Sequence, residues 1–504
     1  MKTLIGLLCI AAAYGLEVGT QKVNFLPTLP SAFSGVQEAT KVTLDANWRW
    51  LHEKNSYSNC FTGDWVGAYC PDPITCSSNC ALEGVEAAEY AATYGISVAG
   101  NALTLKYVTN GQYGVNVGAR TYLVDAAGQN YRIFKLMNRQ FSFTVDVSRL
   151  PCGLNGALYF VEMAADGGKS ALNKPGAPYG TGYGDAQCPT DIKYINGFAN
   201  INKTGACSNE MDIWEANSMA TAYTPHVCSV SGVLACTDPK TCGTGPNRYA
   251  GVCDQDGADY NSYRAGDLTF YGPGTNYKIN TLLPFTVFTQ FITSNGQDTG
   301  DLIAIRRYYS QGGKNIEGFT MTDSTIATQK AKFSENNYFG TLGGLKAMGK
   351  SLSRGLTLVM SLWDDISVQM LWLDSTYPTG SSLPGALRGP CSAATSDVNY
   401  LRSTYPNSQV IYSDIQLSAI SGSAPPTPSP APPTPSPVPS TCSGAYSQCG
   451  GTNWNGPKCC SVAWKCAAMG DCYSQCIPDP TAKIFKCTGC VQGSKWQCDQ
   501  CEPM

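Results

Sequence analysis

The stretch Asn209-Glu210-Met211-Asp212-Ile213-Trp214-Glu215-Ala216-Asn217 places three carboxylates within six residues. If this stretch is a β-strand, its side chains alternate between two faces, so Glu210, Asp212 and Trp214 are expected on one face. Glu215 has the opposite parity, and a β-bulge between Asp212 and Glu215 would return it to the face of the other acids. A helix fits less well, because it would place Glu210 and Glu215 about 140° apart.

Three carboxylates on one face repel each other and drive their pKa values apart. One carboxyl group can then stay protonated and act as an acid, while another stays ionised and acts as a nucleophile. Two other interpretations remain open at this point. The stretch could be a solvated acidic strand, or its oxygens could bind calcium, which prefers carboxylate ligands.

The composition excludes several classes of function. Only 14% of the 504 residues are charged, against a usual value of about 25%. The net charge of -3 gives no reason to expect nucleic acid or an anionic membrane as a partner. The only histidines, His52 and His226, are too few for a histidine-built zinc site. We expect no metal and no cofactor, and no G-x-S-x-G motif of a serine hydrolase is present.

The N-terminus is typical of a secretory signal peptide. Lys2 precedes the apolar run from Leu4 to Ala13, and we expect cleavage after Gly15, so that residues 1–15 are removed. No later apolar run approaches the roughly 20 residues of a membrane span. We therefore expect a soluble, extracellular monomer.

Cysteine usage agrees with secretion, because extracellular proteins keep disulfides. Of 24 cysteines, Cys9 belongs to the signal peptide and twelve lie between Cys60 and Cys391. The remaining eleven lie between Cys442 and Cys501. Since eleven is odd, one thiol of this group is left over for another role.

Residues 16–420 are predicted to form one large all-β domain. Alternating runs such as Phe141 to Val147 and Phe285 to Phe291 are separated by turn residues. Further apolar strand candidates are 302–305, 356–362 and 368–373. Many short strands without β-α alternation predict a sandwich or jelly roll, and the best of the few helix signals covers 82–92.

The C-terminal region predicts a tether and a small stapled module. Residues 421–440 (SGSAPPTPSPAPPTPSPVPS) form a linker, because this density of proline favours extended polyproline II. The cysteine-dense remainder is too short for a core of its own and must be held by disulfides. Such a module would raise the local concentration of the large domain at an insoluble substrate.

Tryptophans and a few polar residues are further candidates for the site. Trp48 and Trp50 are expected on one strand face, and Trp363 and Trp372 recur near aspartates. Exposed indoles can stack on sugar rings, although tryptophans equally often fill cores. His226 could tune the acid's pKa or be structural. Asn202-Lys203-Thr204 is an N-glycosylation sequon.

Several motifs together resemble the retaining cellulases of glycoside hydrolase family 7 over residues 46–420. The motifs that carry the resemblance are Asp45-Ala46-Asn47-Trp48-Arg49-Trp50, Leu154 to Tyr159, Glu210 to Ser218 with Thr224-Pro225-His226, Phe270 to Gly274, and Ser361 to Ser375. The resemblance implies a β-jelly roll whose long loops form a cellulose-binding groove or tunnel. Trp214 resembles the cellobiohydrolase version of the motif, since family endoglucanases often carry leucine there.

The resemblance also implies roles for individual residues. Glu210 would be the nucleophile, Glu215 the acid/base, and Asp212 the residue that tunes the nucleophile. Such retaining chemistry requires carboxyl groups about 5–5.5 Å apart. Trp48, Trp50, Trp363 and Trp372 match the tryptophans that stack on successive glucose units. Polar groups along the groove are matched by Asn155, Tyr159, Asp185, Gln187, Arg248, Asp256, Asp259, Arg264 and Arg388.

Residues 441–476 resemble a fungal-type family 1 cellulose-binding module. Tyr446, Tyr473 and Gln475 match its flat binding face, and Cys472 stands where a further aromatic residue is expected. Residues 477–504 form a cysteine-rich tail of unknown role. The implied substrate of the whole chain is cellulose and its oligosaccharides.

Departures from the family pattern predict a partly opened tunnel. The segments 200–209 and 337–345 are short, and Ile366-Ser367 replaces a Tyr-Tyr pair, while the loop 236–253 is retained. We therefore expect a cellobiohydrolase-like enzyme, with an endoglucanase as the alternative and a non-catalytic cellulose-binding protein as a remote one. The resemblance also implies six disulfides: Cys60–Cys80, Cys70–Cys76, Cys152–Cys391, Cys188–Cys207, Cys228–Cys253 and Cys236–Cys242.

Overall fold

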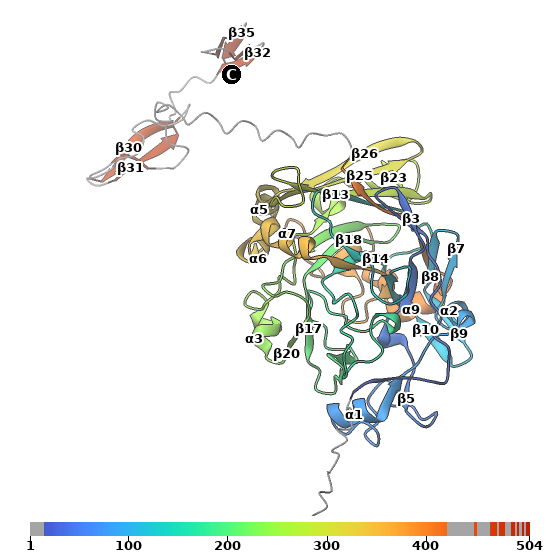
Figure 1. Ribbon diagram of the computed structural model, residues 1–504. Coiled ribbons are helices and arrows are strands. Elements are labelled where there is room, and N and C mark those ends of the chain that lie inside the picture. The colour runs from blue at the N-terminus through green and yellow to red at the C-terminus, as the bar shows by residue number, and fades with distance from the viewer. Residues whose placement is uncertain are drawn as a thin grey trace, which may run out of the picture. The chain divides into compact units, whose positions relative to one another are not determined.

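The chain divides into two units, Met1–Pro425 and Pro426–Met504, and two mainly antiparallel β-sheets form the centre of the first (Figure 1). The computed structural model describes residues 15–420 and, beyond them, the backbone of short strands between 448 and 503. The eight-stranded sheet has the order β21 (Tyr260–Asn261), β19 (Thr221–His226), β18 (Glu210–Ala216), β14 (Leu154–Val161), β27 (Leu356–Asp364), β11 (Ala119–Val124) and β4 (Lys41–Leu44), and β12 (Ile133–Phe134) pairs with β27.

The nine-stranded sheet packs against the first. Its order is β26 (Lys314–Met321), β25 (Leu302–Gln311), β24 (Phe285–Thr293), β13 (Arg139–Asp146), β28 (Gln409–Ala419), β2 (Ser31–Phe33) and β3 (Val36–Glu38), while β8 (Ala102–Lys106) pairs with β28 and with β7 (Ile96–Ala99). Fully buried rings from both sheets meet between them, as where Phe141 of β13 lies edge-on to Phe160 of β14 at 5.0 Å. The all-β jelly-roll prediction is confirmed, and so are the alternating strands around 141–147 and 285–291.

The helix prediction was partly wrong. Only α2 (Ala87–Ala92) lies within the expected stretch, whereas α5 (Asp323–Lys332) and α7 (Gly344–Arg354) are longer. The glycines of α7 weaken its sequence signal, but Gly349 allows a close approach to β25. A Cβ at position 349 would lie 2.8 Å from the Cβ of Leu302. The expected strand at 368–373 is instead a turn followed by α8 (Leu371–Asp374).

All six predicted disulfides of the large unit are confirmed. Cys152–Cys391 joins residues 239 apart in sequence, whereas Cys70–Cys76 and Cys236–Cys242 each close a loop of six. The long bridge encloses the acidic strand β18 and most of the strands around it. The segment that carries the acids therefore lies within a loop that this disulfide closes covalently.

The second unit contains a three-stranded antiparallel sheet of β29 (Gln448–Gly450), β31 (Tyr473–Pro478) and β30 (Trp464–Gly470). Two pairs of short strands follow, β32 (Phe485–Thr488) with β35 (Gln500–Pro503) and β33 (Val491–Gln492) with β34 (Trp496–Gln497). The signal peptide to residue 14, the linker 421–440, Tyr446 and the side chains of Tyr473 and Gln475 lie outside what the structure describes. Among the described residues, no helix is long and apolar enough to cross a bilayer.

Candidate active site

A β-bulge in β18 brings the three acids to one face of the sheet. The register of β18 with β19 shifts between Asp212 and Glu215, as the sequence predicted, and Ile213 is the extra residue relative to β14. One correction concerns Trp214, which was expected beside the acids. Because the bulge reverses parity after Ile213, Trp214 is fully buried in the core and packs edge-on against Phe143 at 6.1 Å.

Each of the two glutamates has a distinct hydrogen-bond partner. Asn155 of β14 donates through Nδ2 to Oε1 of Glu215 at 3.0 Å, and the backbone N–H of Ala186 donates to Oε2 of Glu210 at 3.0 Å. Burial raises the pKa of Glu215, and repulsion from Asp212 raises it further. Burial and the charges of Asp212 and Asp185 also raise the pKa of Glu210, but the Ala186 N–H opposes this rise. The site therefore holds more carboxyl groups than it readily ionises, which suits one acid and one nucleophile.

His226 of β19 completes this cluster. Its Nε2 lies 3.1 Å from Oδ2 of Asp212, and its Nδ1 lies 2.8 Å from the carbonyl oxygen of Asp254. Burial alone would lower the pKa of His226, but the hydrogen bond to Asp212 and its charge raise it to about 9. A doubly protonated ring donates from both nitrogens and has no lone pair for a metal. Although ligand atoms of Glu210, Asp212 and His226 lie within 4.8 Å of one another, this charge state disfavours a metal bound through the ring of His226.

The raised pKa of His226 makes a prediction about stability. Because the folded-state pKa of about 9 exceeds the ordinary value of 6.5, the folded protein holds this proton more tightly than the unfolded chain. The pair then stabilises fully below pH 6.5, and its contribution is lost as pH rises through about 9. Wild-type Tm should fall more steeply over this window than that of His226→Gln, as measured by thermal unfolding across pH. Parallel curves for the two proteins would contradict the assignment.

Beside Glu210, three predicted groove residues are connected. Tyr159 and Tyr183 share a hydrogen bond between their hydroxyls at 2.8 Å, and the Tyr183 hydroxyl donates to Oδ2 of Asp185 at 2.7 Å. Gln187 donates through its backbone N–H to Oδ1 of Asp185 at 2.8 Å. Tyr183 was not predicted, although it lies only two residues before Asp185. Its role as the link depends on a contact between β14 and an irregular segment, which spacing alone does not reveal.

Beside Glu215, a different network gathers. Arg264 binds both oxygens of Asp259 at 2.7 and 2.8 Å, and Arg388 lies 3.4 Å from the same carboxylate. Although burial alone would raise the pKa of Asp259, the two arginines lower it. Glu335, which the sequence analysis missed, also pairs with Arg264. The charge of Asp259 also contributes to the raised pKa of Glu215.

Arg248 and Asp256, the remaining predicted polar residues, form a third group. Arg248 donates to Asp256 at 2.5 Å and to Oε1 of Gln255 at 3.1 Å. The Tyr249 hydroxyl donates to the other oxygen of Asp256 at 2.7 Å. This pair belongs to the loop 236–253 and the segment directly after it, and it is separate from the cluster around Asp259.

The four predicted tryptophans are all partly or largely exposed. Trp363 is 37% exposed and lies 6.4 Å from Trp372, ring centre to ring centre. A correction applies to Trp48 and Trp50, which do not share a strand. Asp45 caps a 3-10 helix over Ala46–Trp48, and Trp50 precedes β5 (Leu51–Glu53). The indole N–H of Trp50 donates to Oδ1 of Asn59 at 2.7 Å.

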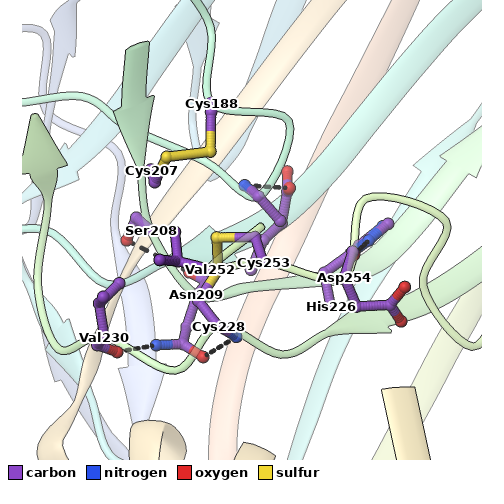
Figure 2. Close-up of a disulfide and its surroundings, with 12 residues drawn as sticks. Cys188, Cys207, Ser208, Asn209, His226, Cys228, Val230, Val252, Cys253 and Asp254 are labelled. Carbon is purple, nitrogen blue, oxygen red and sulfur yellow. Dashed lines mark hydrogen bonds between the residues drawn. A yellow bond between two sulfur atoms is a disulfide. The ribbon is translucent and has the colours of Figure 1, made fainter. Parts of the chain in front are cut away.

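Two disulfides and a buried amide brace the chain around β18 (Figure 2). Cys207, three residues before Glu210, is bonded to Cys188, and Cys228, two residues after His226, is bonded to Cys253. Asn209 donates to the carbonyl of Val230 at 2.8 Å and accepts from the N–H of Cys228 at 2.7 Å. These contacts hold the end of the β18–β19 pair at which Glu210 lies opposite His226.

Comparison with known proteins agrees with this geometry. Residues 28–423 match the family model described as Glycosyl hydrolase family 7, and residues 445–473 match that of the Fungal cellulose binding domain. The chain is 44% identical to Exoglucanase GH7B of Limnoria quadripunctata over 440 residues, which are 82% of this chain and 97% of that protein.

Solved structures give the same result. A GH7 family cellobiohydrolase from Daphnia pulex is 45% identical with a TM-score of 0.78, covering 80% of this chain and 99% of the other. The Humicola insolens endocellulase EGI is 33% identical with a TM-score of 0.70, covering 80% of this chain and 99% of the other.

Proposed function

The chain belongs to glycosyl hydrolase family 7 and is a cellobiohydrolase-like cellulase, and from this premise we propose which residues perform the reaction. Glu210 is the nucleophile and Glu215 the acid/base. Asp212, held by His226, tunes the charge between them. The observation that carries this proposal is the bulge at Ile213, which gathers the three carboxyl groups on one face.

In the first step, Glu215 protonates the glycosidic oxygen while Glu210 attacks the anomeric carbon. The raised pKa of Glu215 keeps its proton available, and the hydrogen bond from Asn155 orients it. The Ala186 N–H favours the ionised form of Glu210. A covalent glycosyl-enzyme forms and the leaving sugar departs.

In the second step, Glu215 acts as a base. It takes a proton from water, which attacks the anomeric carbon and breaks the bond to Glu210. Two inversions give net retention of configuration. The protonated His226 stays paired with Asp212 throughout, so the charge that Glu210 experiences stays fixed between the steps.

The substrate contacts four groups of residues in this proposal. Trp48, Trp50, Trp363 and Trp372 stack on successive glucose units. Tyr159, Asp185 and Gln187 contact sugars near Glu210. Asn155, which hydrogen-bonds Glu215, contacts sugars near Glu215 together with Asp259, Arg264 and Arg388. Arg248 and Asp256 contact the chain from the loop above.

We further propose a partly opened tunnel. Ile366, at the position of the replaced Tyr-Tyr pair, is 72% exposed. The opposite loop 236–253 keeps its Cys236–Cys242 bridge, and the Tyr338 hydroxyl donates to the carbonyl of Gly251 at 2.7 Å. The loop on one side of the groove is therefore held in place, while the loop on the other side is short.

An open roof predicts more internal cleavage on crystalline cellulose. The ratio of soluble to insoluble reducing ends should be lower than that of a closed-tunnel cellobiohydrolase assayed in parallel. A ratio equal to that of the closed-tunnel enzyme would contradict the open roof. A rapid viscosity drop without cellobiose as the main product would instead indicate the alternative, an endoglucanase.

The rest of the chain delivers this domain to its substrate. We propose residues 16–420 as the catalytic domain, 421–440 as a linker, 441–476 as the cellulose-binding module with Tyr446, Tyr473 and Gln475 on its face, and 477–504 as a tail. Binding to crystalline cellulose should weaken on truncation after residue 440. Unchanged binding would contradict the module's role.

We also propose that the protein is secreted as a monomer after removal of residues 1–15. Leu16 is fully buried and its N–H donates to the carbonyl of Leu172, which makes it part of the folded domain. Asn202 lies exposed in a turn, as an N-glycan acceptor requires. N-terminal sequencing and intact mass of the secreted protein, before and after deglycosylation, test both points.

A further inference from the structure

The bulge in β18 takes the backbone carbonyl of Ile213 out of the regular hydrogen-bond ladder of its sheet. Ile213 is the extra residue relative to β14, and Ile213 and Trp214 together oppose Tyr223 of β19. An extra residue in a bulge is left out of ladder pairing. Because Ile213 is fully buried, an unmet carbonyl at this point would disfavour the bulge.

Arg307 meets that need from the opposite sheet. It lies on β25, it is fully buried, and its Nη2 donates to the carbonyl of Ile213. Its guanidinium carbon lies 4.2 Å from the ring centre of Tyr223. One side chain from the nine-stranded sheet thus contacts both strands that flank the irregular register.

The surroundings of Arg307 are shaped to hold it. The Tyr223 hydroxyl donates to the carbonyl of Phe319 on β26 at 2.7 Å. The register of β25 with β26 shifts opposite Arg307, between Arg306 and Tyr308. A Cβ at Gly318 would lie only 2.8 Å from the carbonyl oxygen of Arg307 and 3.1 Å from its Cγ. The close backbone approach at Gly318 leaves the arginine little freedom to move.

Stability alone accounts poorly for a cation at this place. Among the residues that the structure describes, Nε and Nη1 of Arg307 have no hydrogen-bond partner, and no carboxylate pairs with it. Burying a charge without a counter-ion is costly, and apolar residues of similar volume often serve a core better. The Nη2 of Arg307 donates instead to the carbonyl of Ile213, the residue that decides where Glu215 points.

We propose that Arg307 is a positioning residue for Glu215, holding the bulge at Ile213 through its carbonyl and the ring of Tyr223. This inference rests on the proposed role of Glu215 as the acid. Loss of the hydrogen bond would let the bulge relax and move the Glu215 carboxyl group. A displacement of about 1 Å in a catalytic group can cost about 100-fold in rate.

The test compares Arg307→Met and Arg307→Lys on two substrates. Cellotetraose has a poor leaving group that needs the acid, whereas a dinitrophenyl lactoside does not. For Arg307→Met we expect kcat/KM to fall about 100-fold on cellotetraose but less than about tenfold on the lactoside. The limb of the pH profile that reports Glu215 should shift as well. Arg307→Lys keeps a charge and a donor but not the planar group over Tyr223. Its kcat/KM on cellotetraose should therefore lie between that of the wild type and that of Arg307→Met.

Arg306→Met is the matched control. Arg306 is the next residue on β25, but it is partly exposed and pairs with Glu317, so both substrates should be affected by less than about twofold. Equal losses on both substrates with an unshifted pH profile would show a structural role only and overturn the proposal. If Arg307→Met does not fold, Arg307→Lys and Tyr223→Leu carry the same comparison. Failure of Glu215→Gln to discriminate between the substrates would overturn the role of Glu215 itself, which separates the two outcomes.

Discussion

Glu210→Gln should abolish hydrolysis while binding of cello-oligosaccharides survives. The amide keeps the size of the side chain and can still occupy the place beside the Ala186 N–H, but it cannot form the glycosyl-enzyme. Removal of a nucleophile costs at least about 10⁴-fold in kcat. Turnover of an aryl lactoside and calorimetric binding of cellotetraose measure the two effects separately.

Glu317→Gln is a matched control for the loss of a carboxylate. Glu317 lies exposed on β26 of the nine-stranded sheet, away from the acids on β18, and pairs with Arg306 of the neighbouring strand β25. Its loss should leave turnover and binding unchanged. Wild-type turnover in Glu210→Gln would remove the nucleophile assignment, whereas parallel loss of binding and turnover would point to a folding defect.

Glu215→Gln should discriminate between leaving groups. Without a proton donor, cleavage of cellotetraose should fall by about 10²–10⁴-fold, the usual contribution of general acid catalysis. A dinitrophenyl lactoside should lose much less in its first step, because its leaving group needs no proton. A glycosyl-enzyme should then accumulate, because the base of the second step is also missing.

Mass spectrometry of the stopped reaction would detect that accumulated glycosyl-enzyme. Asn155→Ala serves as the companion variant, because it removes the hydrogen bond to Glu215 but leaves the carboxyl group. Asn155→Ala should lose more activity on cellotetraose than on the dinitrophenyl lactoside, as Glu215→Gln does, but both losses should be smaller. Equal losses on both substrates in Glu215→Gln would argue against the acid role.

The fold could be predicted from the sequence because strand alternation and turn residues are local signals. Strand alternation in 141–147 follows from period-two burial, and the parity of Glu210 and Glu215 required a bulge that the structure contains. The same parity argument failed for Trp214, because the bulge reverses every side chain after Ile213. Parity places a residue correctly only when the position of the extra residue is known.

The supporting contacts were beyond local reasoning. Tyr183 links Tyr159 to Asp185, and Glu335 joins Arg264, through contacts between segments far apart in sequence. Trp48 and Trp50 were expected on one strand because they alternate, but Asp45 caps a 3-10 helix over Ala46–Trp48 instead. Arg307 has an ordinary strand sequence around it, and only the facing sheet reveals what it binds.

The disulfide between Cys152 and Cys391 has a consequence for how the protein responds to proteolysis. A cut at any one of the 239 peptide bonds between the two cysteines would leave both fragments covalently attached. They would remain at high effective concentration and in their folded contacts. A cleaved molecule should therefore separate into two bands on a denaturing gel only after its disulfides are reduced. Before reduction it should still degrade its substrate.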